Sequence, residues 1–275
     1  ACEVGETGTL KIPLYPEGHR AAWIVDGQQR SLALSAAKDR SIAVPVIGFV
    51  SDELAIQREQ FILVNKARKL PTGLINELLP EVSVLLPRNL AAKQLPSTLC
   101  EALNTDPKSP FLKLIKRESD AKDRVGIVTD SALIETMKAS LKTPAGALGQ
   151  YKHNGDGNDT EAMYGVMLLY WTAVRDTFPD AWGKPPTESR LMHSAGIRAM
   201  GALMDTVVLR ADAAADKAAA VRATLQRLAP HCCWTSGTWE GLGLIWNEIQ
   251  STSQHITKLS DHLMHVERDL ARAAS

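Results

Sequence analysis

The chain has 275 residues, of which 45% are hydrophobic and 23% charged, as in a globular protein of one large domain or two ordinary ones. Its 31 Lys and Arg residues balance its 31 Asp and Glu residues, which argues against a strongly basic nucleic-acid binder and restricts any DNA contact to a local patch. No apolar run reaches transmembrane length, no signal peptide is evident and the four cysteines lack paired spacing, so we expect a reduced, cytoplasmic protein. Because the first residue is Ala rather than Met, we also expect a further N-terminal segment in the natural protein.

The first 90 residues mix strand and helix signals. Residues 8–14 and 21–25 read as strands, 31–38 as a short helix, and 41–50, which is rich in β-branched residues, as a buried strand. Helices are expected from about 51 to 68 and over 73–79.

The rest of the chain reads as helical. The expected helices cover residues 96–117, 130–140, 159–178, 187–209, 213–229 and 238–273. We therefore predict an α+β protein with a mixed domain over residues 1–120 and a helical domain over 121–275.

The segment Asp26-Gly27-Gln28-Gln29-Arg30 lies where a strand passes into a helix. A helix begins with N–H groups that lack intrahelical acceptors and carries partial positive charge there. Glycine permits close approach of a ligand, and an arginine in the first turn opposes the helix dipole unless an anion is bound. We therefore predict a phosphate site formed by Gly27, Gln28, Gln29, Arg30 and Ser31. Asp26 either orients Arg30 or holds a metal through water; the alternative is a plain surface turn.

A second segment supplies further donors. Asn65, Lys66, Arg68 and Lys69 cluster at the expected end of a helix, just before Leu70-Pro71. The simple interpretation is a basic helix C-terminus, which the dipole favours. Together with the first segment, Asn65, Arg68 and Lys69 become candidates for binding a polyphosphate.

Both segments resemble the DGQHR-domain family of the ParB/sulfiredoxin-like superfamily. Asp26–Arg30 stands at the D-G-Q-[HQ]-R position, and the run from Asn65 to Pro71 resembles the E-N-x-x-R-x-x-L-x-P run of ParB proteins. The helical part agrees more weakly, as in "WNEIQSTSQHITKLSDHL". Two sites depart from the pattern: Val64 replaces the glutamate tied to Mg²⁺ in ParB, and Gln29 replaces the commoner histidine.

The resemblance implies a ParB-like nucleotide-binding domain that uses ATP and Mg²⁺, with Asp26 and Arg30 as the candidate catalytic residues. It implies an ATPase of a bacterial DNA-modification system that assists a transglycosylase inserting a deazaguanine base. The alternative is a non-catalytic DNA-binding regulator of a DNA phosphorothioation system, and a third candidate is a nucleotide-dependent restriction protein. The base preference, hydrolysis and oligomeric state are left open.

Other features favour structural roles. A metal site is poorly matched by the cluster His231-Cys232-Cys233 with His262 and His265. Structural zinc sites prefer separated cysteine pairs, and these two cysteines are adjacent. We expect five tryptophans to belong to the core rather than to stack bases: Trp171, Trp182, Trp234, Trp239 and Trp246. A run of basic residues around Lys113, Lys116 and Arg117 is a candidate strip for DNA phosphates, although a solvated surface is the simpler interpretation.

Overall fold

The computed structural model describes residues 16, 22, 24, 26–37, 44–48, 51, 53–64, 70–83, 86–120, 126–152 and 157–273. The chain divides into two compact units, Ala1–Leu70 and Pro71–Ser275, here called the N-terminal unit and the helical unit. Residue 120, where the sequence suggests a boundary, lies inside the helical unit.

The N-terminal unit contains helices α1 (Gln28–Ala36) and α2 (Leu54–Val64) in its described part. The strands predicted over 8–14 and 21–25 lie almost wholly outside the described residues. The buried strand predicted over 41–50 is not observed in residues 44–48, where the side chains of Val46 and Ile47 are 81% and 98% exposed. Pro45 supplies no backbone N–H there, which weakens strand pairing.

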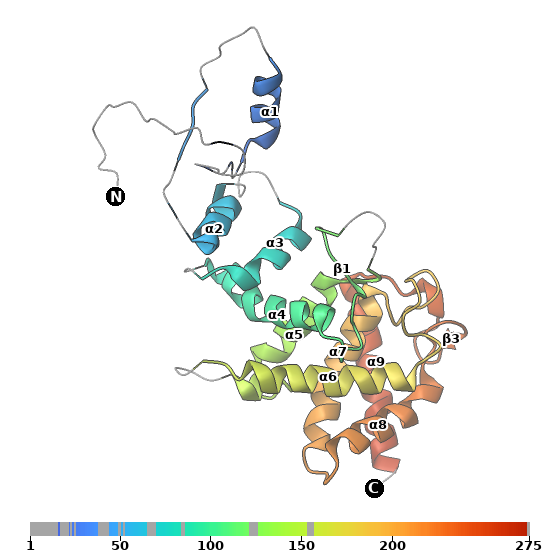
Figure 1. The fold of residues 1–275 in the computed structure, drawn as a ribbon. Coiled ribbons are helices and arrows are strands. Elements are labelled where there is room, and N and C mark those ends of the chain that lie inside the picture. Colours follow the sequence, from blue (N-terminus) through green and yellow to red (C-terminus); the bar gives the residue numbers. More distant parts are fainter. Residues whose placement is uncertain are drawn as a thin grey trace. The chain divides into compact units, whose positions relative to one another are not determined.

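The helical unit is built from helices that pack pairwise around one core. They are α3 (Thr72–Leu78), α4 (Arg88–Thr105), α5 (Asp130–Lys142), α6 (Thr160–Thr177), α7 (Ser194–Ala211), α8 (Lys217–Leu228) and α9 (Ser253–Ala273), with short 3₁₀ turns η2 (Leu79–Glu81), η3 (Gly149–Tyr151), η4 (Ala229–His231) and η5 (Trp246–Glu248). Helix α7 packs against α5, α8 and α9, and α6 packs against α8 (Figure 1). No helix in the described ranges is long and apolar enough to cross a membrane.

Two small sheets interrupt the helices. Strands β1 (Ile115–Lys116) and β2 (Val128–Thr129) pair in parallel, and β3 (Thr238–Trp239) and β4 (Leu244–Ile245) form an antiparallel hairpin. The sequence had suggested a purely helical domain over residues 121–275. The structure instead places short strands within it. The broader α+β class agrees with this content of helices and short strands.

Several predicted helices are too long. Residues 106–114 form turns rather than helix, because Pro107 and Pro110 cannot continue the helical hydrogen bonding. Helix α9 begins at Ser253 instead of 238, since the preceding segment is the β3–β4 hairpin with Gly241 and Gly243 at positive φ. Helix α7 likewise begins at Ser194 rather than at 187.

Aromatic rings fill the centre of the helical unit. The ring of Phe111 lies 5.1 Å from that of Trp171 and 5.0 Å from that of Trp182, measured between centroids. Trp171 and Trp239 are fully buried and Trp234 is 3% exposed, which confirms the core role predicted for these three tryptophans. Edge-on aromatic contacts of this kind add to the stability gained from burial alone.

Candidate functional site

The predicted phosphate-binding turn is described from Asp26 onward. Gly27 precedes α1 as its N-cap with φ 87° and ψ 18°, a left-handed conformation that glycine adopts without strain. The first intrahelical bond runs from the Ser31 N–H to the Gly27 carbonyl, at 2.9 Å. The N–H groups of residues 28 to 30 therefore have no intrahelical acceptor, and Gly27 has no side chain that could accept from them. The start of α1 thus offers the backbone donors that the sequence predicts, three residues earlier than expected.

The side chains of this turn face solvent. Arg30 donates to Asp26 Oδ2 at 3.2 Å, with side-chain exposures of 78% for the arginine and 42% for the aspartate. Gln28 donates through Nε2 to the Ile24 carbonyl at 3.1 Å, and Gln29 and Ser31 are exposed. Asp26 therefore supplies an internal counter-charge for Arg30. This pair weakens the sequence argument that an arginine in the first turn requires a bound anion.

The second predicted segment cannot be placed against the first. Asn65, Lys66, Arg68 and Lys69 lie outside the described residues. Helix α2 ends at Val64, the position where the ParB pattern has a glutamate. The site is thus described for its Asp26–Ser31 half alone.

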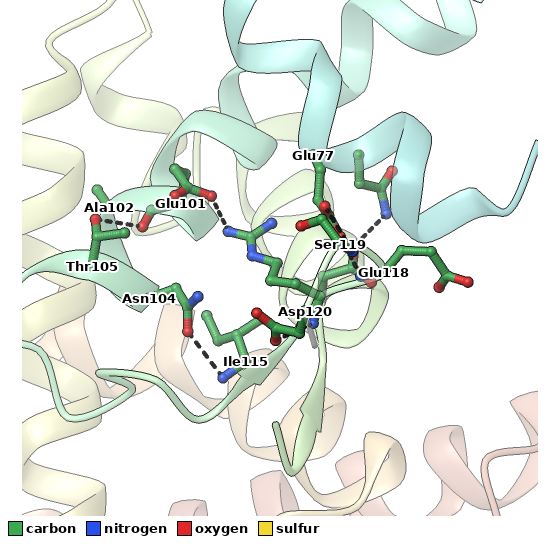
Figure 2. A network of polar contacts seen from close by, with 12 residues as sticks. Glu77, Glu101, Ala102, Asn104, Thr105, Ile115, Glu118, Ser119 and Asp120 are labelled. Carbon is green, nitrogen blue, oxygen red and sulfur yellow. Dashed lines mark hydrogen bonds and ion pairs between the residues drawn. The ribbon is translucent and has the colours of Figure 1, made fainter. Parts of the chain in front are cut away.

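A polar network that the sequence did not predict joins α3 and α4 to the segment 115–120 (Figure 2). The Glu77 carboxylate accepts from the backbone N–H groups of Glu118 and Ser119, the latter at 3.3 Å. Arg117 donates to Glu101, and its backbone N–H donates to Asp120 Oδ2 at 3.2 Å. These polar groups bind one another, so the network holds the segment 115–120 against α3 and α4. Sequence spacing could not reveal it, because Glu77 and Ser119 are 42 residues apart.

Arg117 is consequently lost as a phosphate contact. Its side chain is 6% exposed and is paired with Glu101, whose side chain is 46% exposed, so this arginine of the basic run is buried and already neutralised. Lys122 and Arg124, further along this run, lie outside the described residues. In the part of the strip that the structure describes, Lys113 and Lys116 are the exposed basic residues.

An open groove of about 390 Å³ separates the β3–β4 turn from one face of α9. Its lining residues are Gly241, Leu242, Lys258, Asp261, His262 and His265. The His262 ring packs edge-on against Trp239, with ring centroids 6.1 Å apart. Burial, followed by the charges of His265 and His231, lowers the pKa of His262, so its ring is neutral at pH 7. As the sequence spacing suggests, His262 and His265 share a helix face.

The described histidines and cysteines are spread over several elements of the helical unit. Among the residues that the structure describes, no group of three or more His, Cys, Asp and Glu side chains could hold a metal ion. Burial raises the pKa of Cys100 to about 12 and also raises the pKa of Cys232 well above its usual value. These thiols stay protonated near neutral pH and are therefore poor nucleophiles.

Comparisons with known proteins return no match of any kind. No family model matches the chain, and no curated protein sequence and no solved structure matches it either. The likeness to the DGQHR-domain family therefore rests on the motif residues themselves, of which Asp26–Arg30 are described here.

Proposed function

We propose that the protein binds a nucleotide through the turn that begins α1 and that it serves a bacterial DNA-modification system. The observation that carries this proposal is the conformation of Gly27, which opens a helix whose first N–H groups have no intrahelical acceptor beside an exposed arginine. Backbone N–H groups at a helix start together with a guanidinium are a recurrent way to bind phosphate. The DGQHR resemblance adds ATP and Mg²⁺ as the proposed ligands.

Phosphate binding would proceed by exchange of partners at Arg30. In the free protein the guanidinium lies 3.2 Å from the Asp26 carboxylate, and both side chains are exposed to solvent. Exposed pairs of this kind contribute little free energy, so a polyphosphate with several negative oxygens can compete for the arginine. Asp26 would then keep the guanidinium oriented or hold Mg²⁺ through water, while Gln28, Gln29 and Ser31 offer further donors.

Hydrolysis is the less supported half of the proposal. Water attack on a terminal phosphate depends on positioning and charge neutralisation rather than on covalent chemistry. Asn65, Arg68 and Lys69 would supply part of that neutralisation, but Val64 stands in place of the Mg²⁺-linked glutamate of ParB proteins. We therefore place nucleotide binding first and ATPase activity, in support of a transglycosylase that inserts a deazaguanine base, second.

Equilibrium binding of labelled ATP with Mg²⁺ tests this proposal. Arg30→Ala is expected to weaken binding about 10- to 100-fold, the effect of removing one charge-assisted hydrogen bond. Arg222→Ala is the matched control, because it removes the same charge from an exposed position on α8 in the helical unit. Equal ATP affinity for the wild type, Arg30→Ala and Arg222→Ala, or no binding at all, would refute the nucleotide site.

The role of Asp26 can be separated by varying the metal. If Asp26 only orients Arg30, Asp26→Asn should bind ATP as well as the wild type or slightly better, with and without Mg²⁺, because a competing negative charge is removed. If Asp26 holds Mg²⁺, the same variant should lose affinity in the presence of Mg²⁺ and keep it without the metal. The two outcomes assign Asp26 to one role or the other.

A second candidate function is a DNA-binding transcriptional regulator without catalytic activity. The observation in its favour is Val64, since the missing carboxylate removes a Mg²⁺ ligand of the ParB pattern. A regulator of this kind should shift its own promoter DNA in a gel without nucleotide turnover. An ATPase should turn over ATP without requiring that DNA sequence.

A further inference from the structure

Helix α7 begins with an unusual capping residue. His193 is its N-cap, with φ −74° and ψ 153°, and its ring nitrogen Nδ1 accepts a hydrogen bond from the Ala195 N–H at 3.3 Å. Caps are usually Ser, Thr, Asp or Asn, whose oxygens accept at any pH near neutrality. An imidazole nitrogen accepts only while it is unprotonated, so this cap depends on the charge state of the ring.

The cap sits at the start of a central helix. Eleven of the 18 residues of α7 are buried, and α7 packs against α5, α8 and α9. Next to the cap, the Ser194 hydroxyl lies 3.0 Å from the Thr129 hydroxyl, which immediately precedes α5. The first turn of α7 therefore also fixes a contact between the beginnings of two packed helices.

The charge of Arg190 disfavours a protonated His193 ring. Arg190 is held in place by bonds from its guanidinium to the carbonyls of Asn247 and Pro186, and the start of α7 itself carries partial positive charge. Arg198 follows one turn along the same helix.

Three carboxylates near the start of α7 have partners other than His193. Asp130, at the start of α5, accepts from Ser131 and from the Asn76 amide, and Glu248 accepts from the Ile245 N–H. Glu135 lies on α5 and lines a small cavity together with Arg198 of α7. Its carboxylate accepts from Lys138. Asp130, Glu248 and Glu135 are therefore each bound to another group and do not pair with His193.

We propose that His193 makes the start of α7 an acid-sensitive cap. At neutral pH the ring holds the first turn of α7. On acidification the ring becomes a donor at both nitrogens, the bond from Ala195 is lost, and the first turn of α7 and its Thr129–Ser194 contact loosen. The inference is independent of nucleotide binding, because every residue it uses belongs to the helical unit.

The direction of the pH dependence follows from the same surroundings. Burial, followed by the charge of Arg190, lowers the pKa of His193 below its usual value of 6.5. The unfolded chain then binds more protons than the folded protein between the two pKa values, so stability falls as the pH drops through 6.5. The loss of stability levels off once the pH is below the pKa of His193 in the folded protein.

Thermal unfolding followed by circular dichroism between pH 7.5 and pH 5 tests the cap. His193→Asn keeps a capping acceptor but cannot titrate, so the melting temperature of the wild type should fall about 2–4 °C more than that of the variant over this range. His262→Gln is the matched control, because it removes the other histidine whose pKa is lowered here and leaves the cap intact. The melting temperature of His262→Gln should still show the fall on acidification that depends on His193.

Hydrogen exchange provides a local measurement. Corrected for the intrinsic pH effect, exchange in a peptide covering residues 194–200 should accelerate on acidification in the wild type and not in His193→Asn. His193→Ala should be destabilised at every pH by the missing cap, without the added acid loss. Identical melting and exchange profiles for the wild type and His193→Asn would overturn the proposal.

Discussion

The two units of this protein treat their apolar side chains in opposite ways. In the helical unit, the core is continuous from Leu99 to Leu263, and Ile245 alone among its described large apolar residues is strongly exposed. In the N-terminal unit, Ile62 is the one buried apolar side chain among those described. The exposed ones are Ile24, Leu32, Val44, Val46, Ile47 and Leu54. Helix α1, which carries the candidate phosphate site, buries none of its residues.

This contrast indicates where stability and function reside. Burial of apolar surface is the main favourable contribution to folding, so the helical unit should supply most of the protein's stability. Residues that bind ligands are commonly found on segments with few packing contacts, held on a more rigid scaffold. The exposed Asp26–Ser31 turn is a segment with few packing contacts, whereas α7 belongs to a rigid, buried core.

The largest expected effect comes from a matched pair of leucine truncations. Leu203→Ala on α7 removes a fully buried side chain and should cost about 2–5 kcal/mol of unfolding free energy. Leu32→Ala on α1 removes a side chain that is 63% exposed and should change stability by no more than about 0.5 kcal/mol. Urea denaturation followed by circular dichroism measures both. Equal losses would show that the two units are not as different as their burial suggests.

A smaller effect should separate two helical glycines. A Cβ at Gly201 would lie 2.1 Å from Thr136 Cγ2 on the facing helix, so Gly201→Ala should cost about 1–3 kcal/mol through overpacking. Gly165 lies on α6 with nothing within 4 Å of its Cβ position, so Gly165→Ala should instead stabilise by about 0.5–1 kcal/mol. The sign of the difference in denaturation midpoint decides whether α5 and α7 pack as closely as described.

The smallest expected change is at Arg30. The Asp26–Arg30 pair is exposed to solvent, so Arg30→Ala should leave the unfolding free energy unchanged to within about 0.5 kcal/mol. Unaltered stability combined with weakened ATP binding would assign the arginine to ligand recognition. A clear loss of stability would instead make Asp26 and Arg30 a structural pair and remove the contrast drawn between the units.

Local sequence signals predicted helices α5 and α6 well. The expected helices over 130–140 and 159–178 correspond to α5 and α6 within two residues, since both carry apolar periodicity and α6 has Asp159 as a capping side chain that accepts from the Ala162 N–H. The Asp-Gly pair marked the junction before α1, although the helix was expected at residue 31 and begins at Gln28. These features depend on neighbours within one or two turns, which the sequence displays directly.

Features that depend on distant residues could not be predicted. The Glu77 carboxylate accepts from backbone N–H groups at 118 and 119, about forty residues further along the chain. Strands β1 and β2 likewise pair across an intervening segment. The pairing of Asp26 with Arg30 is a local contact that the sequence offered as one of two roles for Asp26, but the motif did not show whether Asp26 or a ligand balances the charge of the arginine. Histidine as a capping residue also escaped notice, since the usual cap signals are Ser, Thr, Asp and Asn.

The packing of Phe111 with Trp171 and Trp182 has a spectroscopic consequence. Five of the six tryptophans of the chain follow residue 71, so ultraviolet emission reports mainly on the helical unit. Trp171 is fully buried beside Phe111 and Trp182, so its emission should lie at short wavelength and shift to the red when this unit melts. The sixth, Trp23, precedes Asp26 by three positions, and in a variant that keeps it alone it would serve as a built-in optical probe for events near the candidate phosphate turn.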